Sequence, residues 1–205
     1  MEMADFNKDP YSLVIAGVGG QGNVMASRLL GSMFVTKGFS VTVGETFGAS
    51  QRGGSVMSHI RISRQSSWSP QIPAFGADLI AALEPVEGLR VLAQYGNPHC
   101  VLLCNTHPVY PVNVIKGEDA YPPLGDIKRH VKSLTPHATF IDATGEARRL
   151  GNPILANMII LGALSRMGDL PLERGDFKEA IRERVKTDQV ALNMRAFDAG
   201  RALCL

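Results

Sequence analysis

SLVIAGVGGQG, residues 12–22, is the stretch that decides the fold. It begins with a short run of apolar, partly β-branched residues and ends in four glycines, Gly17, Gly19, Gly20 and Gly22. An apolar run bounded by turn residues is typical of a buried strand. From residue 23 apolar side chains recur at helical spacing as far as Gly38, a typical helix stop. The stretch therefore predicts a strand, a glycine-rich turn and a helix.

The glycine-rich turn has a consequence for binding. Without Cβ atoms, the backbone N–H groups at the positive end of the following helix stay uncovered. A phosphate or carboxylate can approach them closely. We therefore expect this first loop to face a ligand or a partner protein, and its residues are Gly17, Gly19, Gly20, Gln21 and Gly22.

Further along the chain, strand patterns alternate with helix patterns. Strands are expected at residues 40–44, 55–62, 78–83, 99–105 and 139–143, and helices at 85–95, 126–134, 154–167, 176–186 and 190–203. This alternation predicts an α/β fold of three-layer, Rossmann-like type, with a mainly parallel sheet and helices on both faces. No repeat or linker divides the sequence, so we expect a single domain over residues 1–205.

The composition excludes several classes of protein. Hydrophobic residues make up 45% of the chain and charged residues 20%, as in an ordinary globular protein. The net charge of +2 is scattered along the sequence and favours neither nucleic acid nor a membrane surface as a partner. The opening residues lack the features of a secretion signal, and the longest apolar run, residues 154–164, is too short to span a bilayer. We expect a cytoplasmic protein.

Familiar catalytic and metal-binding signatures are missing from the sequence. The cysteines Cys100, Cys104 and Cys204 form no CxxC pair, and the five histidines show no metal-ligand spacing. The sequence contains no GxSxG elbow, P-loop, HExxH motif or GDG stretch for thiamine diphosphate. We therefore predict no metal site and no catalytic residue in this chain, which would borrow its reactive groups from elsewhere.

A dinucleotide fingerprint is present in part. Gly17, Gly19 and Gly22 match GxGxxG, and Glu45 at the end of the second strand could bind a ribose hydroxyl of NAD or FAD. A helix should then follow, but residues 46–54, TFGASQRGG, form a second glycine-rich loop instead. The same glycines also occur where a helix packs closely on a strand. A free-standing nucleotide-binding oxidoreductase remains one alternative.

The second loop carries a cation between glycines. Its residues of interest are Ser50, Gln51, Arg52, Gly53 and Gly54. The planar guanidinium of Arg52 suits a phosphate or carboxylate, and the neighbouring glycines let such a group come close. Alternatively, Arg52 forms an ion pair with Glu45 or another surface acid, and the glycines only make a turn.

Two later segments each contain one residue, Trp68 or Asn157, whose surroundings can be predicted. Residues 64–75 form a Ser/Pro-rich excursion with the only tryptophan, Trp68, which either meets a partner or lies over the edge of its own domain. The predicted helix at 154–167 is apolar nearly all round, so it is buried in the fold or in a subunit interface. Asn157 within it is expected to be a hydrogen-bonded core amide.

Four segments together resemble the gamma subunit or domain of 2-oxoacid:ferredoxin oxidoreductases. They are GVGGQG at 17–22, ASRLLG at 26–31, GASQRGGSVMSHIRI at 48–62 and GNPILANMIILGAL at 151–164. The resemblance extends from about residue 12 to residue 203, and SQRGG is its most specific part. Within the family the chain is most similar to the beta subunit of the indolepyruvate branch.

The resemblance implies a part in the oxidative decarboxylation of a 2-oxoacid, such as indolepyruvate or another aryl oxoacid, to an acyl-CoA. In this family, thiamine diphosphate, [4Fe-4S] clusters and coenzyme A are used on or with larger partner subunits, and ferredoxin accepts the electrons. This chain would bind no cofactor alone and would not be active alone.

The resemblance also suggests what the loops do. We expect Ser50, Gln51 and Arg52 to face the partner's active site and to hold an anionic group, either the substrate carboxylate or a phosphate of coenzyme A. The first loop would shape the same cleft, because both loops should leave the carboxyl edge of the sheet. The alternative is a purely structural assembly subunit whose glycine loops contact only protein.

Overall fold

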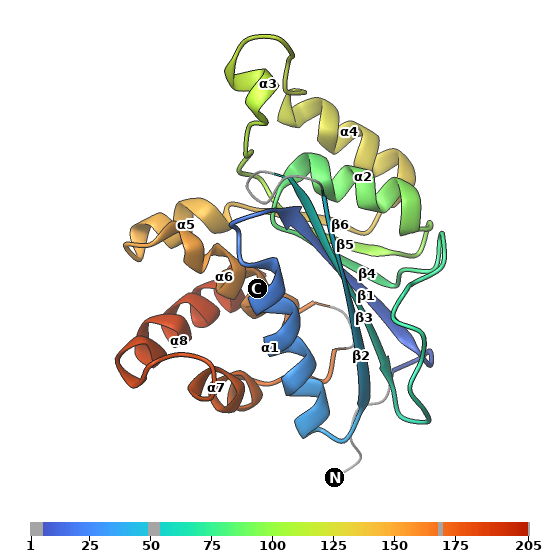
Figure 1. Cartoon of the computed structure of the whole chain (residues 1–205), viewed down its shortest axis with the longest axis vertical. Coiled ribbons are helices and arrows are strands. Elements are labelled where there is room, and N and C mark those ends of the chain that lie inside the picture. The colour runs from blue at the N-terminus through green and yellow to red at the C-terminus, as the bar shows by residue number, and fades with distance from the viewer. Residues whose placement is uncertain (1–5, 49–53, 168–169, 205) are drawn as a thin grey trace.

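The computed structural model describes residues 6–48, 54–167 and 170–204, which form a six-stranded sheet with helices on both sides (Figure 1). The strands are β1 (Tyr11–Val18), β2 (Ser40–Phe47), β3 (Ser55–Ser63), β4 (Leu79–Ala82), β5 (Val101–Asn105) and β6 (Ala138–Ile141). Their order in the sheet is β2-β3-β1-β4-β5-β6.

Five of the strands point the same way. β1, β4, β5 and β6 form parallel neighbours, whereas β3 is antiparallel to both β1 and β2. The connection from β2 to β3 is too short for a crossover, so β3 must return antiparallel to β2. The predicted α/β class with a mainly parallel sheet is confirmed, with β3 inserted between β2 and β1 as the exception.

The helices form two layers, one on each face of the sheet (Figure 1). One layer holds α1 (Asn23–Thr36), α5 (Ala143–Arg149), α6 (Ala156–Leu164), α7 (Arg174–Arg182) and α8 (Thr187–Ala202). The other holds α2 (Pro85–Tyr95) and α4 (Leu124–Leu134). The short helix α3 (Val112–Ile115) and the 3-10 turn η1 (Pro153–Leu155) lie in connections. The three-layer prediction is therefore confirmed.

Strand periodicity explains how β1 joins the two layers. Leu13 and Ile15 pack into the core with α1 and α6, while Val14 and Ala16 pack into the core with α2. Successive side chains of a strand point to opposite faces of the sheet. All four residues are fully buried, as the uninterrupted apolar run of this strand predicts.

Some element boundaries differ from the predictions. β2 continues through Thr46 and Phe47, and the late helix begins as the turn η1 and has its last helical residue at Leu164. α5 was not expected, because its sequence ATGEARR is short and has no apolar periodicity. It begins at Asp142, whose carboxylate accepts a hydrogen bond from Gly145 N at 2.8 Å as an N-cap.

The excursion that follows β3 covers its own sheet. Arg61 of β3 donates through Nη1 to the carbonyl oxygen of Gln71 at 3.2 Å. Its guanidinium carbon lies 5.5 Å from the ring centre of Trp68, a cation–π arrangement. Trp68 therefore lies over the edge of its own domain, which is one of the two positions expected for it.

None of the helices in the described ranges combines the length and the apolar character needed to cross a membrane.

Candidate functional site

The loops after β1 and β2 leave the same edge of the sheet, the carboxyl edge of the parallel strands. Gly19 N donates to the carbonyl oxygen of Gly54 at 2.8 Å, and Gly48 N donates to that of Ser55 at 2.7 Å. The first loop is therefore hydrogen-bonded to the base of the second. Gly54 is the one predicted residue of the second loop that the structure describes; Ser50, Gln51, Arg52 and Gly53 lie outside the described residues.

Gln21 holds the first loop in place. Its Oε1 accepts from Val18 N and its Nε2 donates to the carbonyl oxygen of Leu83, both at 2.9 Å. The amide therefore ties the turn after β1 to the residue that follows β4. Both ends of the side chain are used inside the chain, so Gln21 positions the loop.

Asn157 supports the loop from the opposite side. Its Nδ2 donates to the carbonyl oxygen of Gly22 at 3.4 Å, across 135 positions of sequence. Gly22 has φ +80°, in the left-handed region, and precedes the first residue of α1. The prediction that Asn157 is a hydrogen-bonded core amide is confirmed. The helix α6, which carries Asn157 and contacts the glycine turn, is buried within the fold.

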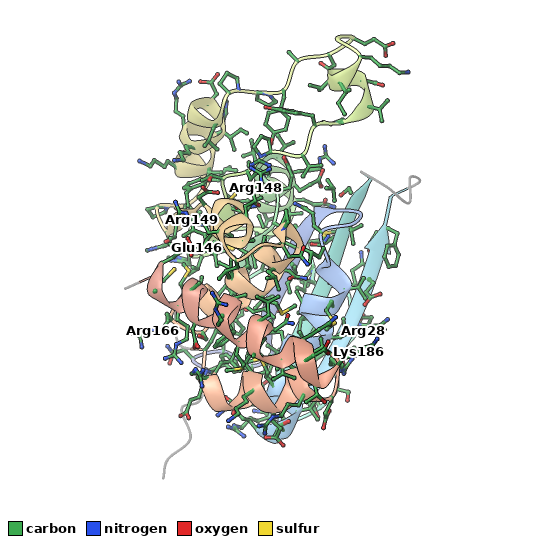
Figure 2. The ribbon with its side chains drawn as sticks, turned by 90° about the vertical axis from the view of Figure 1, so that its left-hand side faces the viewer. Arg28, Glu146, Arg148, Arg149, Arg166 and Lys186 are labelled. Carbon is green, nitrogen blue, oxygen red and sulfur yellow. The ribbon has the colours of Figure 1, made fainter. Side chains whose placement is uncertain are left out.

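Glu45 does not stand where a dinucleotide fold requires its acid. In that fold the second strand neighbours the first, but here β3 separates β2 from β1. Two strand spacings place Glu45 about 10 Å from β1 along the sheet. Its Oε1 lies 3.4 Å from Nε of Arg28, a residue that Figure 2 labels. The topology therefore argues against a ribose contact.

Two buried carboxylates brace the carboxyl edge. Glu84, after β4, accepts hydrogen bonds from Glu87 N at 2.8 Å, Val109 N at 3.4 Å and the Tyr121 hydroxyl. Burial raises the pKa of Glu84 above its ordinary value, although these hydrogen bonds lower it. Glu87 accepts from Ser55 Oγ at 2.6 Å, which fixes the base of the second loop on α2.

Two adjoining cavities open around the first loop. One has a volume of about 210 Å³ and lies between Gln21, Leu83, His107, Val109, Thr144 and Arg148. The other has a volume of about 350 Å³ and lies between Gly19, Gly22, Val24, Phe47, Val56 and Ile154. Gly20 and Ile154 line both. The carboxyl edge therefore offers space beside the glycine loop, where open α/β sheets bind ligands.

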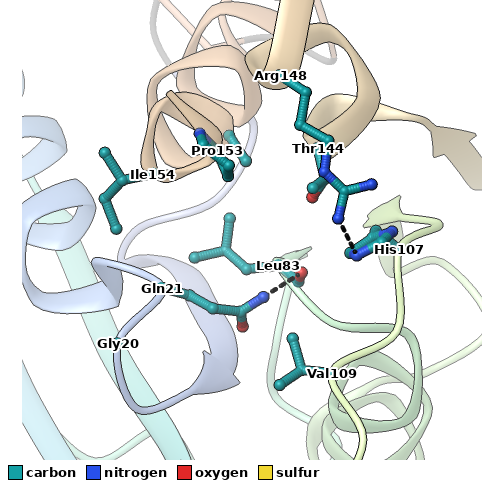
Figure 3. A pocket seen from close by; sticks show the side chains of 10 residues that line it. Gly20, Gln21, Leu83, His107, Val109, Thr144, Arg148, Pro153 and Ile154 are labelled. Carbon is teal, nitrogen blue, oxygen red and sulfur yellow. Dashed lines mark hydrogen bonds between the residues drawn. The ribbon is translucent and has the colours of Figure 1, made fainter. Parts of the chain in front are cut away.

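The smaller cavity contains a paired imidazole and guanidinium (Figure 3). Arg148 Nη2 lies 3.0 Å from His107 Nε2. A guanidinium only donates hydrogen bonds, so Nε2 accepts and the ring proton is on Nδ1. Desolvation lowers the pKa of His107 below its ordinary value, the charge of Arg148 lowers it further, and Asp142 opposes the shift.

The cavity is also braced across β5 and α5. Asn105 Nδ2 donates to Thr144 Oγ1 at 2.8 Å and to the carbonyl oxygen of Leu83 at 3.0 Å. Thr144 N returns a hydrogen bond to Asn105 Oδ1 at 3.3 Å. Asn105 is completely buried, so this network fixes the wall that presents Thr144.

Sequence reasoning did not identify the pair His107 and Arg148. His107 was one of five histidines without metal spacing, and Arg148 belongs to the unexpected helix α5. A positional signal exists: His107 follows β5 closely, and Arg148 lies in the helix that follows β6. Residues just beyond the carboxyl ends of parallel strands are where ligands bind in such sheets.

Cys100 and Cys104 do not suit an iron–sulfur cluster. Cys100 and Cys104 are fully buried, and burial raises the pKa of each thiol to about 12. Cluster ligands are thiolates, which this environment disfavours. Across the ranges described, no three His, Cys, Asp or Glu side chains gather in a way that could hold a metal ion.

Comparisons with known proteins agree with this architecture. Residues 12–203 match the model of the family described as pyruvate ferredoxin/flavodoxin oxidoreductase. Indolepyruvate oxidoreductase subunit IorB of Pyrococcus horikoshii is 39% identical over 191 residues, which cover 93% of this chain and 94% of that protein.

Solved structures share the fold. The gamma subunit of a keto/oxoacid ferredoxin oxidoreductase from Geobacter sulfurreducens PCA superposes with a TM-score of 0.68 at 21% identity, covering 95% of this chain and 98% of that one. A 2-oxoglutarate:ferredoxin oxidoreductase from Magnetococcus marinus gives a TM-score of 0.75 at 21% identity, covering 97% of this chain and 31% of that one. The described sheet and helices therefore follow the gamma-subunit fold.

Proposed function

Because the chain belongs to the pyruvate ferredoxin/flavodoxin oxidoreductase family, we propose that it is the small subunit of an oxidoreductase that acts on an aryl 2-oxoacid such as indolepyruvate. The enzyme releases carbon dioxide from the oxoacid and transfers the acyl group to coenzyme A. The preference for an aryl substrate is supported by the identity to indolepyruvate oxidoreductase subunits.

The reactive cofactors belong to larger partner subunits in this proposal. Thiamine diphosphate supplies the carbanion chemistry, and [4Fe-4S] clusters carry the electrons. The buried thiols of Cys100 and Cys104, with pKa values raised to about 12, support a chain that does not ligate a cluster itself. We further propose that ferredoxin is the electron acceptor and that the enzyme works in the cytoplasm. Residues 1–205 then form one domain.

The observation that carries the proposed role is the hydrogen bond from Gly19 N to the Gly54 carbonyl oxygen, 2.8 Å long. It joins the two glycine loops at the edge where the cavities open. In the proposal this edge faces the active site of the partner, and Ser50, Gln51 and Arg52 help to hold an anion. That anion is the substrate carboxylate or a phosphate of coenzyme A.

The test is Arg52→Ala in the enzyme assembled with its larger subunit. Losing a charged hydrogen bond should raise the KM for the oxoacid or for coenzyme A about tenfold or more. Arg129→Ala is the matched control, because Arg129 is an exposed arginine of α4 that pairs with Asp126 on the surface. If both KM values and the turnover match those of the control, the proposed role of the loop is wrong.

A structural subunit is the second candidate, and one feature favours it. The helix α3 buries none of its residues, and Val112 and Ile115 are 61% and 73% exposed. A four-residue helix needs tertiary packing to be stable, so a partner surface would suit it. This candidate predicts that substitutions in the glycine loops change subunit assembly but leave the kinetics of the assembled enzyme intact.

A further inference from the structure

Arg148 differs from other arginines around the carboxyl edge in the group that its guanidinium contacts. Arg149, its neighbour in α5, pairs with Glu146 at 2.6 Å, and Arg28 pairs with Glu45 at 3.4 Å. Within the part of the chain that the structure describes, Arg148 is in ion-pair distance of no acid. In those ranges its guanidinium is hydrogen-bonded to His107. A guanidinium has five N–H donors, so most of the Arg148 donors have no acceptor among the residues that the structure describes.

His107 holds this guanidinium at the wall of the cavity. Because Nε2 accepts from Arg148, the imidazole must be neutral at that nitrogen. Figure 3 shows the two side chains facing each other, with Thr144 beside them. The Thr144 oxygen accepts from Asn105, and the Thr144 hydroxyl hydrogen has no acceptor among the described residues. One wall of the cavity therefore presents two kinds of unused donor.

The remaining wall of the same cavity is largely apolar. It is formed by Leu83, Val109, Pro153, Ile154 and Ala156. A single water needs only about 10–15 Å³ of such space, so a cavity of about 210 Å³ accepts a ring or a branched chain as well as a small anion. The site thus combines a charged end with nonpolar room behind it.

The surroundings favour an anion as the ligand. Figure 2 shows Arg148 on a face that also carries Arg149, Arg166 and Lys186, with Glu146 among them. Of these cations, Arg148 is the one that lines the cavity, and Arg149 is paired with Glu146. The positive charge that lines the cavity is therefore that of the Arg148 guanidinium, which favours an anion.

We propose that this cavity binds a carboxylate that carries a nonpolar group, the chemical class of aryl and branched 2-oxoacids. Arg148 binds the carboxylate, Thr144 donates a hydrogen bond, and Leu83 and Val109 contact the nonpolar group. His107 is a positioning residue for the guanidinium. The assignment of this ligand as the enzyme's substrate class rests on the proposed function; the binding itself does not.

Phosphate is the competing ligand, and the apolar wall disfavours it. A guanidinium binds phosphate as readily as carboxylate. A phosphate group, however, has further charged oxygens that Leu83, Val109 and Ile154 cannot hydrogen-bond, and burying them unpaired is costly. A carboxylate presents both oxygens to Arg148 and turns its nonpolar group toward that wall.

The first measurement uses the full chain without its partner. Phenylacetate, acetate and adenosine 3′,5′-bisphosphate are titrated by calorimetry, while the His107 ring resonances are followed by NMR. We expect phenylacetate to bind at least about tenfold more tightly than acetate, because the phenyl ring is buried. Phenylacetate should also raise the pKa of His107, since the bound carboxylate offsets the charge of Arg148.

Substitutions then assign the binding to the guanidinium. Arg148→Gln should weaken phenylacetate binding about 10- to 100-fold, and Arg148→Lys should give an intermediate loss because lysine keeps the charge without the planar fork. Arg149→Gln is the matched control and should bind like the wild type. Circular dichroism of each variant reports whether the fold is retained.

The proposal is overturned by equal affinity for phenylacetate and acetate, by tighter binding of the bisphosphate than of phenylacetate, or by an Arg148→Gln variant that binds like Arg149→Gln. If Arg148→Gln instead weakens only association with the larger subunit, the guanidinium serves a partner carboxylate and the proposal is equally wrong. The proposed function has a separate test: it is wrong if the assembled complex shows no oxoacid oxidation. The two failures can be told apart because the binding measurement uses the chain without its partner.

Discussion

The contact between α6 and α8 and the loop between β1 and α1 both depend on glycine, but for opposite reasons. A Cβ on Gly162 would lie 1.9 Å from the carbonyl oxygen of Phe197, and one on Gly200 would lie 1.9 Å from that of Ile159. A Cβ on Gly20 of the loop would meet nothing within 4 Å. Glycine lets two helices touch in the first region, and at Gly20 of the second it permits a left-handed backbone with φ +97°.

The atoms that surround the glycines of these two regions differ in how far they can move. Around Gly162 and Gly200 they are backbone atoms of packed helices, which cannot shift without separating α6 from α8. Around Gly22 the nearest group is the side-chain amide of Asn157, 2.2 Å from an added Cβ. The helix contact should therefore tolerate substitution least, and the predictions below follow that order.

The largest effect is expected for Gly162→Ala. The added methyl group meets a carbonyl oxygen that is fixed by two helices, so we expect a loss of about 3 kcal/mol or more in the free energy of unfolding. Gly175→Ala in α7 is the control, since a Cβ there meets nothing within 4 Å. Urea denaturation of both variants makes the comparison, and equal stability of the two would contradict the packing argument.

Gly22→Ala should cost less, about 1–3 kcal/mol, because alanine at φ +80° is strained and the Asn157 amide must move. Adding Asn157→Ala should recover the part of the loss that comes from the clash, but not the part that comes from the backbone. A double-mutant cycle of unfolding free energies separates the two. No coupling between the substitutions would mean that Asn157 does not press on the loop.

Ser55→Ala should remove about 1 kcal/mol, the net worth of its hydrogen bond to Glu87. Glu87 keeps its contact with Arg90 at 2.9 Å, so the carboxylate is not left unpaired. The base of the second loop should loosen, which is measurable as faster amide hydrogen exchange at Gly48 and Gly54. Ser133→Ala, on the exposed surface of α4, should leave that exchange unchanged.

The smallest effect concerns pH and Glu84. Its folded-state pKa is raised above the ordinary 4.5. Between the ordinary and the raised pKa, the folded chain therefore binds more protons than the unfolded chain. The contribution of Glu84 to the free energy of unfolding is therefore fully present below the ordinary pKa, and it is lost as the pH rises through the folded-state pKa. Glu84→Gln does not titrate, so its stability relative to the wild type should increase with pH. A difference that stays flat from pH 4 to pH 8 would refute this.

Local features of the fold were predictable from the sequence. The apolar run at 12–16 predicted β1, and the glycines after it predicted the first loop. The apolar periodicity up to Gly38 predicted α1. The continuous apolar character of residues 154–164 gave a buried helix. These features are predictable because hydrophobic period and turn residues act within a few positions of chain. Helix α5 has neither signal, and so it was missed.

Long-range placement was not predictable in the same way. The pattern of residues 55–62 indicated a strand, but not that β3 would lie between β2 and β1 and move Glu45 away from the glycine turn. Arg52 was chosen as the anion ligand because it lies in a glycine-rich segment. Arg148, which the structure places beside the cavity at the carboxyl edge, carries no such local mark.

By itself, then, the sequence determined the α/β class, the glycine loop at the end of β1 and the family. Only the tertiary structure brought Arg148 to His107, 41 positions away, and Gly19 to Gly54. The physical reason is that strand and helix formation depend on neighbours along the chain, whereas these pairs depend on the order in which six strands assemble.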